Sequence, residues 1–350
     1  MTKYFKYLAF ALIVALVAAC GGAPAQTAAT QGAPGGEFKV GLLVSGPVKD
    51  QGWNQTAYDA FVRIQNELGA KMSYLELGQD QAAYEKAFRD YGSQGYAMVL
   101  GHGNEFQDSA VAVADDFPNT YFFISSSRYD GVKEGHPNVI GLNTDSSQPY
   151  YLFGVIAAMM GKSAGIVGGM NIPPIAETLT GFINGVRSVN PDFPVTTTYL
   201  GNFTDITAAK EAGLAMVAQG VDVLLPNADN AGNGVYQILS ENDKLIGFGT
   251  YRPPSMKDDF TICPKTCVSN YVLDYGEALV ELATQIKAGT FKPTSNIEYG
   301  VADKTVMYIT YNENAATPVP DNVRQAVNNA IQDISSGKVN TLEGNPLTKN

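Results

Sequence analysis

The residue types that usually carry catalysis are scarce in this chain of 350 residues. It has two histidines, His102 and His136, and three cysteines, Cys20, Cys263 and Cys267. Their spacing fits no zinc signature, and no elbow, zincin or phosphate-loop motif is present. We therefore expect a protein that binds a ligand, with no enzymatic activity, metal or other cofactor.

The segment that most favours ligand contact holds the only tryptophan, Trp53, followed by Asn54 and Gln55. An indole offers a flat stacking face, and the two amides offer paired donors and acceptors. The alternative is a tryptophan that only packs a helix against a sheet. We expect this segment to contact the ligand.

Other loops that follow predicted strands also carry aromatic and polar side chains. The pattern Gly101-His102-Gly103 lacks the third glycine of a dinucleotide site, and His102 also fits a hydrogen-bonded loop residue. Each loop alone is compatible with helix capping, but the shared position after strands favours a binding site. The candidate ligand-binding residues are Trp53, Asn54, Gln55, His102, Asn104, Phe106, Asp145, Met170, Phe203, Asp205, Asn227, Asp229 and Tyr251.

Short apolar runs alternate with helical patterns through the body of the chain. Strands are predicted at 39–45, 72–77, 96–100, 121–125, 138–143, 165–169, 195–200, 221–226 and 244–250. Such strands predict an α/β fold of two doubly wound parallel-sheet lobes joined by a hinge. We expect lobe 1 at 37–144 plus about 251–288, and lobe 2 at 145–250 plus about 289–340. Ligands of such sheets bind beyond the carboxyl ends of the strands.

The N-terminus resembles an export signal. Two lysines and an apolar stretch precede Val17-Ala18-Ala19-Cys20, which is typical of a bacterial lipobox, although an ordinary signal peptide with an incidental cysteine is the alternative. We expect a signal peptide at 1–19, a lipid on Cys20 and a flexible tether at 20–36. The protein would then be extracytoplasmic and anchored to a bacterial membrane.

The net charge and the cysteine content indicate which partners and which cysteine chemistry to expect. The chain has 23 basic and 34 acidic residues, a net charge of −11, which argues against nucleic acid as a partner. An oxidising location favours a small disulfide between Cys263 and Cys267 over a redox or metal pair.

Several segments match a known family in order. They are GWNQTAYDAF, GHGNEF, YYLFGVIAAMM, GIVGGMNIPPIAETLTGFINGVRSVNPD and LGNFTD, and they resemble the basic membrane lipoprotein family, which includes purine-nucleoside-binding lipoproteins. The resemblance covers most of residues 37–340 and is strongest at 165–192. It implies a type I periplasmic-binding-protein fold with three crossovers between lobes, and delivery of ligand to the permease of an ABC importer.

The resemblance also implies roles for single residues. Trp53 stands where the family usually has phenylalanine, so it would stack on a base with Asn54 beside it. Phe203 would stack on the opposite side. Nucleosides are therefore the leading ligand class.

Three positions depart from the family. Val44-Ser45 stands where Thr-Asp is common, the family aspartate after the strand GFGTYR is missing, and Tyr271 replaces a lysine. The missing carboxylate would accept from ribose hydroxyls. Its possible substitutes are Glu105, Asp145 and Asp229, whereas Arg128 or Arg252 would suit an acidic ligand. The alternative function is a sensor, or a binding protein for another small polar or acidic solute, that relays to a membrane receptor.

Overall fold

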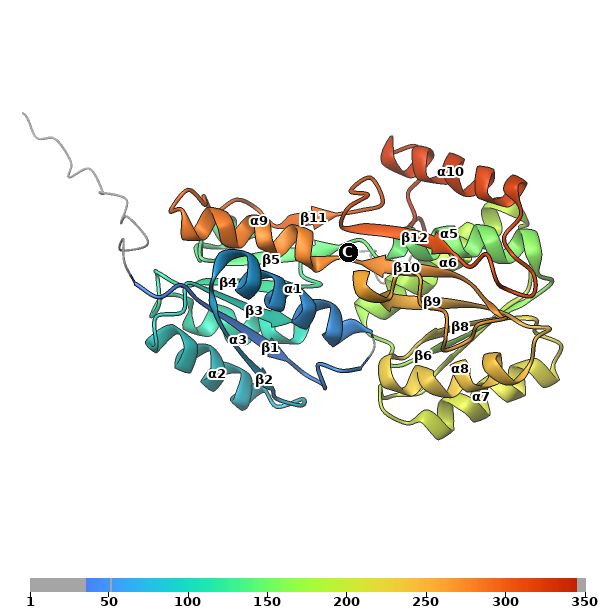
Figure 1. Cartoon of the computed structure of the whole chain (residues 1–350), viewed down its shortest axis with the longest axis horizontal. Helices are drawn as coiled ribbons and strands as arrows, with labels where there is room; N and C mark the ends of the chain where they lie inside the picture. Colours follow the sequence, from blue (N-terminus) through green and yellow to red (C-terminus); the bar gives the residue numbers. More distant parts are fainter. Residues whose placement is uncertain (1–35, 51, 345–350) are drawn as a thin grey trace, which may run out of the picture. The chain divides into compact units, whose positions relative to one another are not determined.

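The computed structural model describes residues 36–50 and 52–344 (Figure 1). The expected signal peptide, the lipid on Cys20 and all but the last residue of the tether lie outside these residues. The strands are β1 (Lys39–Val44), β2 (Lys71–Glu76), β3 (Met98–His102), β4 (Tyr121–Ser125), β5 (Val139–Thr144), β6 (Ala164–Gly168), β7 (Val195–Tyr199), β8 (Val223–Asn227), β9 (Ile246–Arg252), β10 (Cys267–Leu273), β11 (Ile297–Tyr299) and β12 (Met307–Tyr311). The α-helices are α1 (Trp53–Leu68), α2 (Gln81–Ser93), α3 (Gln107–Ala114), α4 (Gly131–Glu134), α5 (Ser147–Met160), α6 (Pro173–Val189), α7 (Ile206–Ala218), α8 (Asn233–Glu241), α9 (Tyr275–Lys287) and α10 (Asp321–Ser335), and the 3-10 helices are η1 (Asn104–Phe106), η2 (Asp229–Gly232) and η3 (Pro254–Met256).

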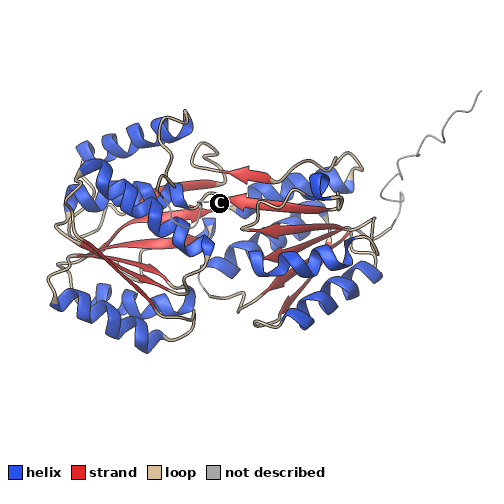
Figure 2. Cartoon of the chain, turned by 180° about the vertical axis from the view of Figure 1, so that it is seen from behind, coloured by secondary structure: helices blue, strands red, loops and turns tan. Residues whose placement is uncertain are grey.

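The strands form two six-stranded sheets. The first sheet has the order β11-β5-β4-β3-β1-β2, and all its pairs are parallel. The second has the order β12-β10-β9-β8-β6-β7, in which only β12 pairs antiparallel. Helices cover both sheets (Figure 2). The two-lobed α/β fold expected from the sequence is confirmed.

The central strands of each sheet are buried on both faces, as their apolar sequences predict, whereas the edge strands β2 and β7 are largely exposed. Within β1, Leu42 packs in the cluster shared with α1 and α9, while the next residue, Leu43, packs with α2 and α3. In the second sheet, Ile166 and Val167 alternate in the same way between the α5–α6 and the α7–α8 layers. Successive side chains of a strand point to opposite faces, which explains the alternation.

Sheet membership after residue 250 differs from the expected lobe boundaries. β10 lies in the second sheet, whereas 251–288 was assigned to lobe 1. Only the short η3 separates β9 from β10 among the helices, and the two strands pair in parallel. The chain instead passes between sheets at β5–α5, at β10–α9 and at β11–β12, since α9 packs on α1 and α10 packs on α5.

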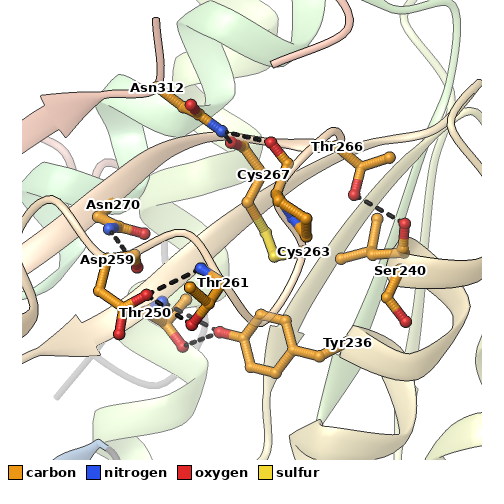
Figure 3. The surroundings of a disulfide bond; sticks show 12 residues. Tyr236, Ser240, Thr250, Asp259, Thr261, Cys263, Thr266, Cys267, Asn270 and Asn312 are labelled. Atoms are coloured by element: carbon orange, nitrogen blue, oxygen red, sulfur yellow. Dashed lines mark hydrogen bonds between the residues drawn. A yellow bond between two sulfur atoms is a disulfide. The ribbon is translucent and has the colours of Figure 1, made fainter. Parts of the chain in front are cut away.

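The connection from β9 to β10 holds the disulfide between Cys263 and Cys267 (Figure 3). Both cysteines are fully buried, and the side chain of Asn312 donates to the carbonyl oxygens of Pro264 and Cys267 over 2.9 Å each. The Thr266 hydroxyl donates to a backbone carbonyl of α8. These contacts fix a compact turn beside the end of β9.

Within residues 36–50 and 52–344, no helix has the length and apolarity to span a membrane.

Candidate ligand-binding site

A pocket of about 580 Å³ is lined by residues from both sheets. Its volume falls in the range of small-molecule sites. Most of its walls come from loops that follow strands, as expected for parallel sheets. The loops after β1, β3 and β4 contribute Asp50, Trp53, Asn104, Glu105 and Arg128, and those after β6, β7 and β8 contribute Met170, Ile172, Phe203 and Asp229.

Trp53 is the first residue of α1 and lines the pocket. One face of its indole stacks on the His102 ring, with centroids 4.2 Å apart and planes at 20°. The rings of Tyr251 and Tyr275 meet the indole edge-on, at 5.4 Å and 6.1 Å. The His102 ring thus occupies one face of the indole, and Trp53 still lines the pocket.

Asp50 explains why α1 begins at Trp53. Its carboxylate accepts from the backbone N–H groups of Gly52, Asn54 and Gln55 and from the Asn54 side chain, at 2.8–3.1 Å. These bonds satisfy donors that a helix N-terminus leaves without partners. The same hydrogen bonds fix the backbone on both sides of Trp53, and they hold the Asn54 side chain in the protein interior.

Asp229 pairs with Asp50 in the pocket. Asp229 is solvent-exposed, and it is one of the residues that line the pocket. Desolvation first, and then the charge and hydrogen bond of Asp50, raise the pKa of Asp229 well above its usual value. Asp229 therefore keeps its proton to higher pH than an ordinary aspartate. The pair offers one carboxylate acceptor and one group that donates when protonated.

Glu105 is a further pocket carboxyl. Desolvation raises its pKa, although hydrogen bonds from its own backbone and from Ser45 oppose the shift. The preceding Gly103 has φ of +138°, and a side chain at this position would overlap the Glu105 carboxylate. The expected glycine turn therefore makes room for a protein carboxylate.

Arg128 links the two sheets at the pocket. Its Nη1 lies 3.1 Å from Glu177 of α6, and its Nε lies 3.4 Å from Glu298 of β11. Glu298 also accepts from the Asn143 side chain at 3.1 Å. The charge of Arg128 is thus met by two protein carboxylates.

Phe203 presents a ring from the second sheet and is partly buried. Its carbonyl oxygen accepts from the Ala231 N–H at 2.9 Å, and the Asn202 side chain accepts from the backbone of Thr204 and Asp205. The Phe203 ring lies over Gly169, where an added methyl group would overlap it. The Phe203 ring therefore fits in this position only because residue 169 is a glycine.

Hydrogen bonds order the remaining polar wall. The buried Asn227 donates to the Thr178 hydroxyl at 2.6 Å, and the Tyr236 hydroxyl accepts from the Thr250 backbone N–H at 3.2 Å (Figure 3). Tyr251 has φ of +49°. Burial raises the pKa of Tyr251 to about 12, so its hydroxyl stays protonated and able to donate.

Comparison with known proteins decides the family. The model of the Bmp family, described as ABC transporter substrate-binding protein PnrA-like, matches residues 38–340. The chain belongs to the Bmp family.

Relatives of this Bmp-family chain are similar over most of their length. It is 27% identical over 317 residues to a purine-binding protein of Brucella abortus, which covers 89% of this chain and 85% of the relative. It is 27% identical to the ABC transporter nucleoside-binding protein BmpA of Lactococcus lactis, over 94% of this chain and 96% of the relative. A solved ABC transporter solute-binding protein from Conexibacter woesei is 25% identical, with a TM-score of 0.67, over 87% of this chain and 98% of that one.

The structure brings seven of the candidate residues of this Bmp-family chain to the pocket: Trp53, Asn104, Met170, Phe203, Asn227, Asp229 and Tyr251. The other six do not line it. His102 and Phe106 are fully buried, and Asn54 is 1% exposed. The remaining three make hydrogen bonds within the protein. The Gln55 side chain hydrogen-bonds Asp59, and Asp145 accepts from the Gln148 side chain. Asp205 caps the N-terminus of α7.

Sequence reasoning missed several lining residues. Asp50 lies in the same loop as Trp53, so the strand-end rule was sufficient to include it. Arg128 and Glu105 were considered only as charged alternatives. Glu177 lies within the first turns of α6, where no sequence pattern separates a pocket residue from an ordinary helix residue. Tyr271, the position of the family lysine, is fully buried and does not line the pocket.

Proposed function

We propose that this protein is a lipid-anchored solute-binding protein that captures a nucleoside between its two sheets and delivers it unchanged to an ABC importer. The observation that carries the proposal is that two aromatic residues from different sheets, Trp53 and Phe203, line the same pocket. Two aromatic rings in one pocket suit a planar heterocycle, because stacking a base on an aromatic side chain is favourable.

The polar groups around the rings support the same ligand class. Asp50 and Asp229 supply a carboxylate and a titratable carboxyl group, and Asn104 supplies an amide. These groups match the mixed donors and acceptors of a base and a sugar. The names of the Brucella and Lactococcus relatives, which give a purine and a nucleoside as ligands, support the proposal from a separate direction.

The test is thermal unfolding of residues 31–350 with adenosine, guanosine, uridine, sugars and amino acids. A ligand at 100 times its Kd adds about 2.7 kcal/mol to the unfolding free energy, so a purine nucleoside is expected to raise Tm clearly. Trp53→Ala is expected to lose that shift. Stabilisation by a sugar or an amino acid, with none by any nucleoside, would refute the nucleoside assignment.

The anchor is tested on the full chain in a bacterial host. The wild-type protein is expected in the membrane fraction, and mass spectrometry is expected to show a lipid on Cys20. The Cys20→Ser variant is expected to leave the membrane fraction and to carry no lipid. Equal membrane retention of the two proteins would contradict the lipid anchor.

A further inference from the structure

The buried imidazole of His102 contacts Trp53 of the pocket wall and two residues behind it, Ser125 and Tyr275. Its ring stacks on the Trp53 indole at 4.2 Å, and its Nε2 lies 3.0 Å from the Trp53 carbonyl oxygen. Its Nδ1 lies 3.0 Å from the hydroxyl oxygen of Ser125, at the end of β4. The Tyr275 ring meets the imidazole edge-on at 5.3 Å. One side chain therefore contacts both the backbone and the ring of the same tryptophan.

The partners of His102 fix its tautomer. A carbonyl oxygen only accepts, so Nε2 carries the hydrogen and donates it to Trp53. Nδ1 then accepts from the Ser125 hydroxyl. Both ring nitrogens are satisfied in the neutral form, so a rotation of the ring would break two buried hydrogen bonds.

The imidazole is uncharged. Burial lowers the pKa of His102 to about 3, against the smaller effect of the Trp53 carbonyl. The titratable side chains that face this group are Tyr275 of α9 and, across the indole, Tyr251 of β9, and burial raises the pKa of both. A neutral ring on one face of the indole leaves the negative potential of the other face intact, whereas an imidazolium would oppose it.

We infer that His102 is a positioning residue for ligand binding, which holds the Trp53 indole as the middle layer of a stack whose third layer is a planar, neutral or cationic ring of the ligand. The part about the ligand ring rests on the proposed function. The part about Trp53 does not, because the imidazole, its two hydrogen bonds and the stack belong to the protein alone.

The first experiment uses the ligand-free protein. Because Trp53 is the only tryptophan beside 19 tyrosines, fluorescence excited at the red edge of the indole absorption and the indole bands of the near-ultraviolet circular dichroism report this residue. His102→Leu is expected to change both spectra, and His102→Gln, which keeps a donor and an acceptor, is expected to change them less. His136→Gln is the matched control at the only other histidine, whose ring contacts Asp115. Spectra of His102→Leu identical to wild type would overturn the inference.

A pH series adds a second readout. Wild-type emission is expected to show no His102 titration between pH 5 and pH 8, because this imidazole stays neutral in that range. A transition near the ordinary histidine pKa that disappears in His102→Gln but persists in His136→Gln would overturn the neutral assignment.

The second experiment measures the Kd for the nucleoside that stabilises wild type most. His102→Leu is expected to raise the Kd about 3- to 10-fold, the scale of one aromatic pair, with a smaller rise for His102→Gln. Ser125→Ala, which removes only the donor to Nδ1, serves if His102→Leu does not fold, and its Kd is expected to rise about 2- to 5-fold. An unchanged Kd in a folded variant with an altered tryptophan spectrum would overturn the link to binding.

The two proposals fail separately. If wild type binds no nucleoside, the nucleoside assignment fails while the spectra of the ligand-free variants still decide the role of His102. If a nucleoside binds and neither variant alters spectrum or Kd, the role of His102 fails and the proposed function stands.

Discussion

The two sheets each present an aromatic ring to the pocket, but they support it differently. Trp53 is held by other side chains, with the His102 ring behind it and Tyr251 and Tyr275 at its edges. Phe203 lies on a loop. Its backbone is held by a hydrogen bond from Ala231, and its ring occupies the space that a side chain at position 169 would fill. We therefore expect the position of the Trp53 ring to change when neighbouring side chains are removed, and that of the Phe203 ring to change when a side chain is added at Gly169.

The largest effect is expected from removing the rings. Trp53→Ala is expected to weaken nucleoside binding about 10- to 100-fold, since stacking of a base is worth about 1–3 kcal/mol. Phe203→Ala is expected to cost about 5- to 10-fold, because a partly exposed ring on a loop loses more freedom when it binds. Calorimetric titration of both variants measures the two losses. A larger loss for Phe203→Ala would reverse the comparison.

A smaller effect is expected from adding a methyl group on the second side. Gly169→Ala places a methyl in the space of the Phe203 ring, so the ring must move. We expect the unfolding free energy to fall by about 1 kcal/mol and the Kd to rise about 3- to 10-fold. Denaturant unfolding and titration measure both. Gly52→Ala is the control for stability beside Trp53, because an added methyl there meets no atom within 4 Å. Equal destabilisation of the two variants would show that the Phe203 side is not specially sensitive.

The smallest effect concerns the carboxyl pair that joins the two sides. The pKa of Asp229 in the folded protein is raised, first by desolvation and then by Asp50, so the folded state holds this proton more tightly than the unfolded state does. The stability that this group contributes is present below its ordinary pKa near 4 and is lost as pH rises through the raised value.

Asp229→Asn removes that loss. Its Tm relative to wild type is expected to rise between pH 4 and pH 8, by about 1–3 °C, a modest gain because pocket water screens the pair. Scanning calorimetry at both pH values measures the difference. A Tm difference that is the same at pH 4 and pH 8 would mean that the two carboxyl groups do not interact.

Seven of the residues predicted from the sequence line the pocket, but the sequence did not predict which way the side chains point. Trp53, Phe203 and Asp229 were found because parallel strands bring their carboxyl ends to one edge. Phe106 satisfies the same rule, yet its ring packs between Tyr84 and Phe88. An aromatic residue after a strand can close a core or face a ligand, and only the three-dimensional packing separates the two outcomes.

His102 shows how a small boundary error changes a role. The predicted strand ended at residue 100, whereas β3 continues to His102, which pairs with Val44 of β1. A strand residue at this position points into the structure instead of belonging to the loop. The Arg128–Glu177 pair was beyond prediction for another reason, since it joins residues from different sheets whose contact depends on the whole fold.

The three crossings between the sheets have a consequence for how the protein is made. The first sheet lacks β11 and the α9 cover of α1 until residues near 299 are available, and the second lacks β12 until residues near 311. A ribosome that has released only the first 250 residues therefore presents two unfinished sheets. Neither sheet is complete until almost the whole chain has been synthesised, so a shorter nascent chain leaves strand edges of both sheets unpaired.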